Sequence, residues 1–118
     1  MKREESEPKG TMEQPPFTPH VTDCVVETLR EALGEKLIAL VLFGSRARGD
    51  FTVTSDWDVL IIARELPARP LERHLTLKRA LPVTCRAVVS LLAKTPEEFE
   101  ASIPSLYLDI ALDGKVLY

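Results

Sequence analysis

The sequence lacks several features that would place it at once in a familiar class of protein. It has no asparagine, one glutamine (Gln14), and aromatic residues make up only 6% of its 118 residues. Scarce amide side chains are one direction that heat-adapted proteins take. No run approaches the about 18 apolar residues of a membrane span, and the charged N-terminus lacks the apolar core of a signal peptide. We therefore expect a cytoplasmic protein.

Cysteine is also scarce, and positive charge is not in excess. Cys24 and Cys85 lie far apart in the chain, without a Cys-x-x-Cys spacing and without a nearby histidine pair. We expect two buried, reduced thiols rather than a zinc site or a redox motif. The net charge of −3 leaves no overall basic field that would attract nucleic acid or an acidic membrane. Any phosphate binding must therefore be local.

The length and composition predict one domain preceded by a leader. Residues 1–20 carry four prolines and many charges and have almost nothing to bury, so we expect a flexible leader there. The remaining chain, residues 21–118, is long enough for one ordinary domain, and the hydrophobic content of 45% can build one core of modest size.

Hydrophobic periodicity and turn residues predict an α+β domain with a mixed sheet flanked by helices. A first helix is expected behind Thr22 or Asp23 as N-cap and before Gly34. A helix start is expected at Thr95, with Pro96 at the first helical position and Glu98 completing a capping box. The other expected elements are strands over 36–43, 57–63, 83–92 and 115–118 and helices over 71–81 and 105–112.

A glycine and a serine form a corner directly after the first expected strand. Gly44 lets a ligand approach the backbone closely, and the N–H groups that follow would open a short helical turn and point outward as anion donors. Arg46 and Arg48 add guanidinium groups, which suit bidentate contact with phosphate. The corner is therefore a basic spot in an acidic protein.

Two aspartates stand where the second strand is about to begin. If that strand has started by Asp56, the carboxylates of Asp56 and Asp58 project from one face and Trp57 from the other. Two neighbouring carboxylates repel each other unless a cation lies between them, and Mg²⁺ prefers carboxylates, water and phosphates. A shared site with Gly44 requires the first two strands to be adjacent and antiparallel.

Each of these features also has an ordinary structural explanation. A Gly-Ser pair after a strand is often only a turn, and an Asp-x-Asp is often a solvated strand entrance. Trp57 suits the core or its rim better than a stacking platform. His20 and His74 have no partners in the sequence and suit surface or helix positions. The combination is much more specific than its parts.

The combined pattern resembles a known family. Gly44-Ser45, ten intervening residues and Asp56-Trp57-Asp58 are similar to the signature of the minimal nucleotidyltransferases in the DNA polymerase beta-like superfamily. The segments RARGD, VLII and TPEEFE add to the likeness, which covers residues 22–118. The resemblance implies a nucleotidyltransferase fold and transfer of a nucleoside monophosphate, usually AMP from ATP, to an acceptor hydroxyl.

The resemblance also implies roles for individual residues. Gly44 and Ser45 would hold the β and γ phosphates, with Arg46 as a further phosphate contact. Asp56 and Asp58 would bind Mg²⁺ and serve catalysis. Members of this family are commonly encoded with a helical HEPN partner and act as antitoxins, in some cases by transferring AMP to the partner. We therefore expect ATP and a HEPN-type protein as partners, and neither a membrane nor nucleic acid.

One departure from the family pattern leaves two functions open. The family has a third carboxylate on the strand before the Thr-Pro-Glu-Glu helix, and here that position falls on about Ser90. The chain is then either an active enzyme or a weak or inactive regulatory subunit that binds a helical partner. The C-terminal segment 103–118 carries more apolar residues than one end helix needs, so it packs on the sheet or docks a partner.

Overall fold

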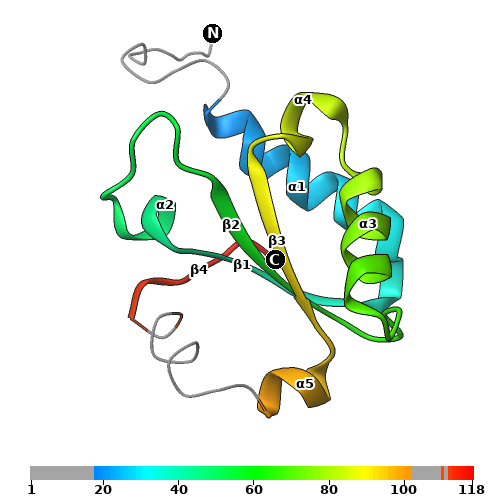
Figure 1. Cartoon of the computed structure of the whole chain (residues 1–118). Coiled ribbons are helices and arrows are strands. Elements are labelled where there is room, and N and C mark those ends of the chain that lie inside the picture. Colours follow the sequence, from blue (N-terminus) through cyan, green and yellow to red (C-terminus); the bar gives the residue numbers. More distant parts are fainter. Residues whose placement is uncertain (1–17, 102–109, 111) are drawn as a thin grey trace, which may run out of the picture.

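A four-stranded mixed sheet, in the order β3-β2-β1-β4, forms the centre of the computed structural model (Figure 1). The structure describes residues 18–101, 110 and 112–118. The strands are β1 Leu37–Phe43, β2 Trp57–Ala63, β3 Val89–Lys94 and β4 Lys115–Val116. The helices are α1 Thr18–Leu33, α2 Ser45–Arg48, α3 Pro70–Ala80, α4 Val83–Arg86 and α5 Pro96–Glu100, and a 3₁₀ turn over Gly34–Lys36 joins α1 to β1.

Strands β1 and β2 are adjacent and antiparallel, as the sequence predicts. The pairing sets Phe43, the last residue of β1, opposite Asp58, the second residue of β2. Strand β3 runs parallel to β2 on its other side, and Ser90 is the register partner of Asp58. The end of β1 and the beginnings of β2 and β3 therefore meet at one edge of the domain.

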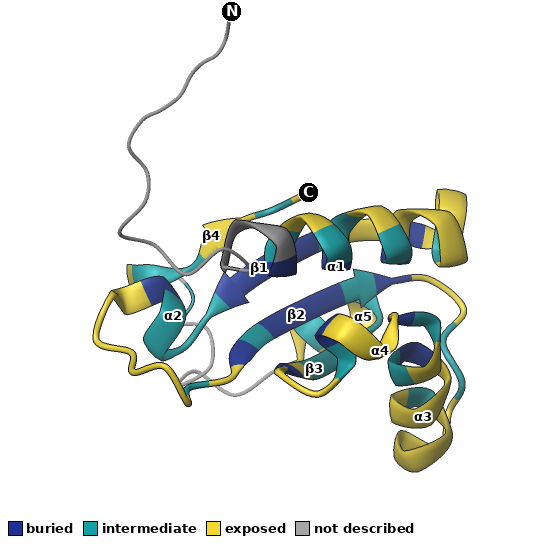
Figure 2. Cartoon of the chain, turned by 90° about the horizontal axis from the view of Figure 1, so that it is seen from above, coloured by how far each residue is buried: buried dark blue, intermediate teal, exposed yellow. Residues whose placement is uncertain are grey.

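One face of the sheet packs against helices α1, α3 and α4 (Figure 1). Alternate residues of β2, among them Val59 and Ile61, point into this core with Leu29 of α1 and Leu81 just after α3, and all four are almost completely buried. Burial of each such side chain contributes about 1.5–3 kcal/mol. The buried strands cross the middle of the domain, while the loop after α2 is exposed (Figure 2). Asp58 alternates with the core residues and so belongs to the opposite face.

The first helix starts earlier than expected. Helix α1 begins at Thr18, so Thr22 and Asp23 lie inside it and neither is its N-cap. Pro19 falls in the first turn, where a missing backbone N–H costs no hydrogen bond. Thr22 and Asp23 therefore belong to a helix that is already formed.

The third expected strand was placed too early. Residues 83–86 form α4, and pairing with β2 covers only Val89–Lys94. The N–H groups of Cys85 and Arg86 donate to the carbonyl of Pro82, and the Arg86 side chain donates to the carbonyl of Leu81. These local hydrogen bonds override the strand preference of the β-branched residues in this stretch.

Several local predictions are confirmed. Thr95 and Glu98 form the expected capping box: the Glu98 N–H donates to Thr95 Oγ1 at 3.2 Å, and the Thr95 N–H donates to Glu98 Oε1 at 2.9 Å. Helix α3 begins at Pro70 and ends at Ala80, close to the expected bounds. The expected helix over 105–112 lies mostly outside the described residues.

In the part of the chain that is described, no helix combines the length and apolar character needed to cross a bilayer.

The two cysteines are both free thiols, as expected. Cys85 is buried in α4, whereas Cys24 is only half-buried in α1. Burial, followed by a hydrogen bond and the charge of Cys24, raises the pKa of the Cys85 thiol to about 12. A thiol that stays protonated at neutral pH is a poor nucleophile, so Cys85 serves the core rather than catalysis.

Candidate functional site

Gly44 lies at the centre of the edge where the three strands meet. Its backbone angles, φ 75° and ψ −158°, belong to a region that is essentially restricted to glycine. A Cβ atom built on Gly44 would overlap Oδ2 of Asp58. Glycine is therefore required twice, once for the backbone turn and once because the Asp58 carboxylate lies directly against this residue.

Helix α2 is the short turn that follows Gly44. The N–H groups of Ala47 and Arg48 donate to the Gly44 carbonyl at 3.1 and 3.0 Å, and the buried Ala47 side chain fixes the turn to the core. The N–H groups of Ser45 and Arg46 precede the first hydrogen bonds within this helix. The expected short helical turn after the corner is therefore present.

The two aspartates occupy different local environments. Asp58 is half-buried in β2 and lies against Gly44, whereas Asp56 is exposed. Strand β2 begins at Trp57, whose N–H donates to the Val88 carbonyl at 2.8 Å, so Asp56 is the residue before the strand. The condition for a shared strand face, a strand that has started by Asp56, is therefore not met. Trp57 is buried in the core, as expected.

Ser90 stands beside Asp58 on the parallel neighbour β3. Register partners on parallel strands lie about 4.8 Å apart and point to the same face, so Ser90, where the resemblance places the family's third carboxylate, is exposed on the face that carries Asp58. Among the described residues, no group of three or more His, Cys, Asp or Glu side chains could hold a metal ion. The site therefore offers two carboxylates, Asp56 and Asp58.

Two carboxylates fit Mg²⁺ when a phosphate ligand is present. Mg²⁺ is usually held by one or two carboxylates and takes its other ligands from water and substrate phosphates. Asp58 is directed at the glycine corner, and Asp56 is open to solvent two residues earlier. This donor set suits a metal that arrives with a polyphosphate better than a metal that is held by protein alone.

The side chain of Arg46 turns toward the loop that leads to Asp56. Its Nε and Nη2 atoms donate to the Ser55 carbonyl at 3.3 and 3.1 Å. Its Cζ atom lies 4.4 Å from the ring centroid of Phe51 and 4.5 Å from that of Trp57. The only sign of these contacts in the sequence is that an arginine and two aromatic residues occur within twelve residues.

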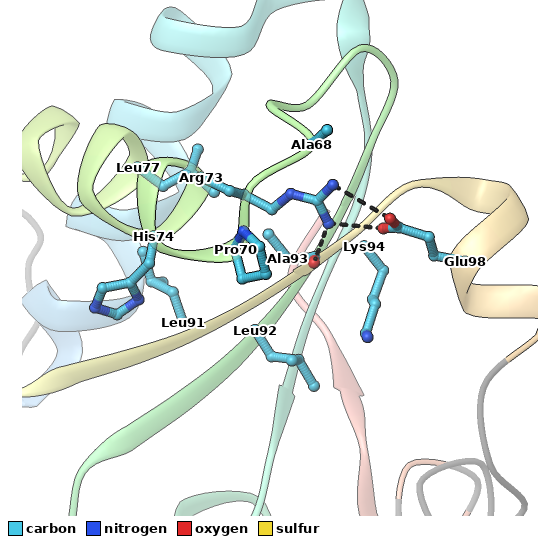
Figure 3. A pocket seen from close by; sticks show the side chains of 10 residues that line it. All are labelled: Ala68, Pro70, Arg73, His74, Leu77, Leu91, Leu92, Ala93, Lys94 and Glu98. Carbon is cyan, nitrogen blue, oxygen red and sulfur yellow. Dashed lines mark hydrogen bonds and ion pairs between the residues drawn. The ribbon is translucent and has the colours of Figure 1, made fainter.

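A cavity of about 300 Å³ lies away from this edge, between α3, β3 and the start of α5 (Figure 3). Arg73 spans it, with Nη1 2.7 Å from Oε1 of Glu98 and further hydrogen bonds to the carbonyls of Pro67 and Ala93. The hydrogen bond from Arg73, followed by that from the Thr95 backbone, lowers the pKa of Glu98 to about 2. The Arg73–Glu98 pair joins α3 to α5, and this pair is called the joint below.

The histidines take no part in the candidate site as described. His74 is exposed on α3 and lines the cavity at the joint, in keeping with the expected helix position. The side chain of His20 lies outside the described residues. No local pattern in the sequence indicates the Arg73–Glu98 pair, because the two residues are 25 positions apart and only the packing of α3 beside β3 brings them together.

The fold and the corner together define the class of protein. A mixed sheet with α2 following Gly44-Ser45 and with Asp58 directed at Gly44 is a nucleotidyltransferase fold. The family model described as "Nucleotidyltransferase domain" matches residues 26–116. The chain therefore belongs to the nucleotidyltransferase domain family.

Three similar proteins of Methanocaldococcus jannaschii are named as candidate protein adenylyltransferases. One is 39% identical over 59 residues, which cover 50% of this chain and 40% of the relative. Another is 54% identical over 35 residues, or 30% of this chain and 35% of the relative. A third is 29% identical over 94 residues, or 79% of this chain and 90% of the relative. The matches to the first two relatives thus span less than half of those proteins' own lengths.

Solved structures share the fold. A chain of a toxin–antitoxin complex with AMP-PNP gives a TM-score of 0.62 at 22% identity and covers 82% of this chain and 72% of that one. A chain of the tri-AMPylated Shewanella oneidensis HEPN toxin in complex with its MNT antitoxin gives a TM-score of 0.58 at 19% identity and covers 85% and 71%. At these identities the likeness establishes the fold alone.

Proposed function

We propose that this chain transfers a nucleoside monophosphate, AMP from ATP, to an acceptor hydroxyl in a Mg²⁺-dependent reaction. The observation that carries the proposal is the contact between Asp58 and Gly44 across the β1–β2 pair. It brings a metal-binding carboxylate to a corner where a polyphosphate can approach the backbone. Membership of the nucleotidyltransferase domain family supports the same reaction.

The proposed roles follow from the chemistry of each group. Gly44 leaves room for the terminal phosphates, and the amide and hydroxyl of Ser45 donate to their oxygens. Asp56 and Asp58 would hold Mg²⁺, which would supply positive charge against the phosphates and against the charge that develops during in-line displacement. The protein then contributes mainly positioning, and no covalent enzyme intermediate is required.

We propose a HEPN-type toxin as the acceptor, so that the chain acts as an antitoxin. The support is the fold shared with chains of toxin–antitoxin complexes, one of which contains a HEPN toxin carrying AMP groups. The names of the Methanocaldococcus jannaschii relatives also point to a protein as the acceptor. The acceptor hydroxyl would then approach the α phosphate from solvent, at the exposed edge beside Asp56.

Ser90 favours a second candidate function. A serine in place of the third carboxylate removes a group that, in this family, commonly binds the metal that activates the acceptor hydroxyl. A loss of about 1000-fold in rate corresponds to about 4 kcal/mol of transition-state stabilisation. A chain with this loss would bind nucleotide and partner while transferring AMP slowly or not at all, as a regulatory subunit.

One experiment separates the two functions. The protein is incubated with labelled ATP and Mg²⁺, with and without the candidate HEPN partner, and ATP uptake is followed by titration calorimetry. If the partner becomes labelled with the native protein but not with the Asp58→Asn variant, the chain transfers AMP. If the native protein binds ATP and the partner but the partner stays unlabelled, the chain is a regulatory subunit. Asp50→Asn is the matched control, because Asp50 is an exposed acid of the same loop that is paired with Arg48. Absence of Mg²⁺-dependent ATP uptake by the native protein would overturn both.

A further inference from the structure

The guanidinium group of Arg46 joins the start of α2 to the residue just before Asp56. Both Nε and Nη2 donate to one acceptor, the carbonyl of Ser55. Arg46 directly follows Ser45, and Ser55 directly precedes Asp56. One side chain therefore connects the proposed phosphate corner to the proposed metal carboxylates.

Two aromatic rings hold this guanidinium in place. Its Cζ atom lies 4.4 Å from the centroid of Phe51 and 4.5 Å from that of Trp57, within the about 6 Å over which a cation and a ring attract. Trp57 is only 8% exposed and belongs to β2, whereas Phe51 is 44% exposed and belongs to the loop. Arg46 thus attaches an exposed loop residue to a buried strand residue.

The loop has few other attachments. Within the described residues, the main-chain groups of 50–55 form hydrogen bonds only with main-chain and hydroxyl groups of the Thr52–Ser55 turn and with Arg46. The next main-chain anchor is the bond from Trp57 N–H to the Val88 carbonyl. The path of the chain into Asp56 therefore depends on Arg46 more than on any main-chain contact of the loop.

We propose that Arg46 is a positioning residue that fixes Asp56 relative to the Gly44-Ser45 corner, rather than a ligand of the phosphates. This inference depends on the proposed function, because it concerns the same site. Two of the guanidinium donors are already used on a protein carbonyl, and the two rings set the plane of the group. Metal and phosphate sites are sensitive to misplacement by about 1 Å, so loosening this link weakens the site without removing a ligand.

The test compares Arg46→Met, Arg46→Lys, Phe51→Leu and the double variant Arg46→Met/Phe51→Leu. The dissociation constant of Mg-ATP is measured by titration calorimetry, and acrylamide quenching of Trp57, the only tryptophan in the chain, reports on the packing of the loop. We expect both Arg46 variants to weaken Mg-ATP binding about tenfold or more, because lysine keeps the charge but not the planar fork. Phe51→Leu should weaken binding by a smaller factor, and the double variant should bind no worse than Arg46→Met.

The matched control is Arg64→Met at the other end of β2. Arg64 also donates to a backbone carbonyl, that of Glu35, at 2.7 Å, but within the described residues it stacks on no ring. Arg64→Met should leave both Mg-ATP binding and the quenching of Trp57 at native values, while the Arg46 and Phe51 variants increase the quenching. Thermal unfolding confirms that each variant is folded.

Three results would overturn the positioning role. Near-native Mg-ATP binding by Arg46→Lys, with loss only in Arg46→Met, would indicate a charge contact with phosphate. If the losses of Mg-ATP affinity in Arg46→Met and Phe51→Leu multiply in the double variant, the two side chains act independently. Native-like quenching of Trp57 in the Arg46 and Phe51 variants would contradict the attachment of the loop by Arg46. This measurement needs no nucleotide, so its failure is distinct from a failure of the native protein to bind Mg-ATP.

Discussion

The parallel strands β2 and β3 carry a different polar arrangement at each of their two ends. Where both strands begin, Asp56, Asp58 and Ser90 gather near Gly44. Beyond the end of β3, the pair Arg73 and Glu98 joins α3 to α5 (Figure 3). At the far end Arg73 forms an ion pair with Glu98, whereas at the near end Arg46 donates to the carbonyl of Ser55.

The difference lies in where the positive charge comes from. At the joint, Glu98 receives its charge partner from within the protein, and its pKa falls to about 2. At the site, Arg46 is turned to a carbonyl and two rings, and no ion pair joins Asp56 to a basic side chain in the part of the chain that the structure describes. The charges of the Arg73–Glu98 pair are neutralised within the protein, whereas the proposed site would take positive charge from Mg²⁺.

The largest expected effect comes from adding a side chain at Gly44. Gly44→Ala forces a positive φ on alanine, which costs about 1–3 kcal/mol, and drives its Cβ into Oδ2 of Asp58. We expect loss of Mg-ATP binding of about 100-fold or more together with a lower thermal midpoint. Gly49→Ala is the control, because Gly49 has φ 92° but a Cβ added there would meet no atom within 4 Å. Gly49→Ala should lower the thermal midpoint but retain Mg-ATP binding. An equal loss of Mg-ATP binding in both variants would contradict a role for the contact between Gly44 and Asp58.

Placing an acid at Ser90 should have a smaller effect of opposite sign, a stronger response to Mg²⁺. Ser90→Asp places a third carboxylate beside Asp58. Like charges should lower the thermal midpoint without metal, and Mg²⁺ should then raise it more than in the native protein. If the chain transfers AMP, the rate should increase about tenfold or more. Ser90→Asn has the same shape without the charge, so a Mg²⁺ response of equal size in that variant would contradict a metal-binding role for this position.

Much of the sheet and the outline of the site were predictable from local signals. Strands β1 and β2 are short apolar runs bounded by Gly44 and by the aspartates, so their bounds and antiparallel pairing followed from composition and from the need to bring Asp58 to Gly44. Counting back from the Thr95 cap placed the family's third acidic position on about Ser90, and the strand register then sets Ser90 beside Asp58. These features are encoded by neighbours in the sequence.

The remaining features depend on contacts that local patterns do not contain. Helix α4 was missed because hydrogen bonds to Pro82 and Leu81 outweigh the β-branched character of Val83 and Thr84. The stacking of Arg46 on Phe51 and Trp57 was missed because it needs a loop that folds back on the preceding helix. The joint was missed because Arg73 and Glu98 meet only through tertiary packing.

Breaking the joint should affect stability and leave the site intact. Glu98→Gln removes the charge opposite Arg73, whose side chain is only 11% exposed, while the Arg73 hydrogen bonds to Pro67 and Ala93 remain. Since the Glu98 side chain is 43% exposed, solvent screens the pair, and we expect a loss of about 1 kcal/mol in the free energy of unfolding. Glu97→Gln, at the exposed neighbour in the same helical turn, should change it by less. Weaker Mg-ATP binding in Glu98→Gln would show that the two ends are coupled.

The smallest expected effect is the pH dependence of the loss in the free energy of unfolding that Glu98→Gln causes. Because the pKa of Glu98 is about 2 in the folded protein and 4.5 is its ordinary value, the unfolded state binds the proton more readily between these limits. The stabilisation by Glu98 is therefore complete above about pH 4.5 and declines as the pH falls toward about 2. Denaturant unfolding of the native protein and Glu98→Gln across this range should give free energies that converge at low pH. A difference that stays constant from pH 6 to the lowest pH at which both proteins fold would show that Glu98 stabilises the fold through contacts that do not depend on its ionisation.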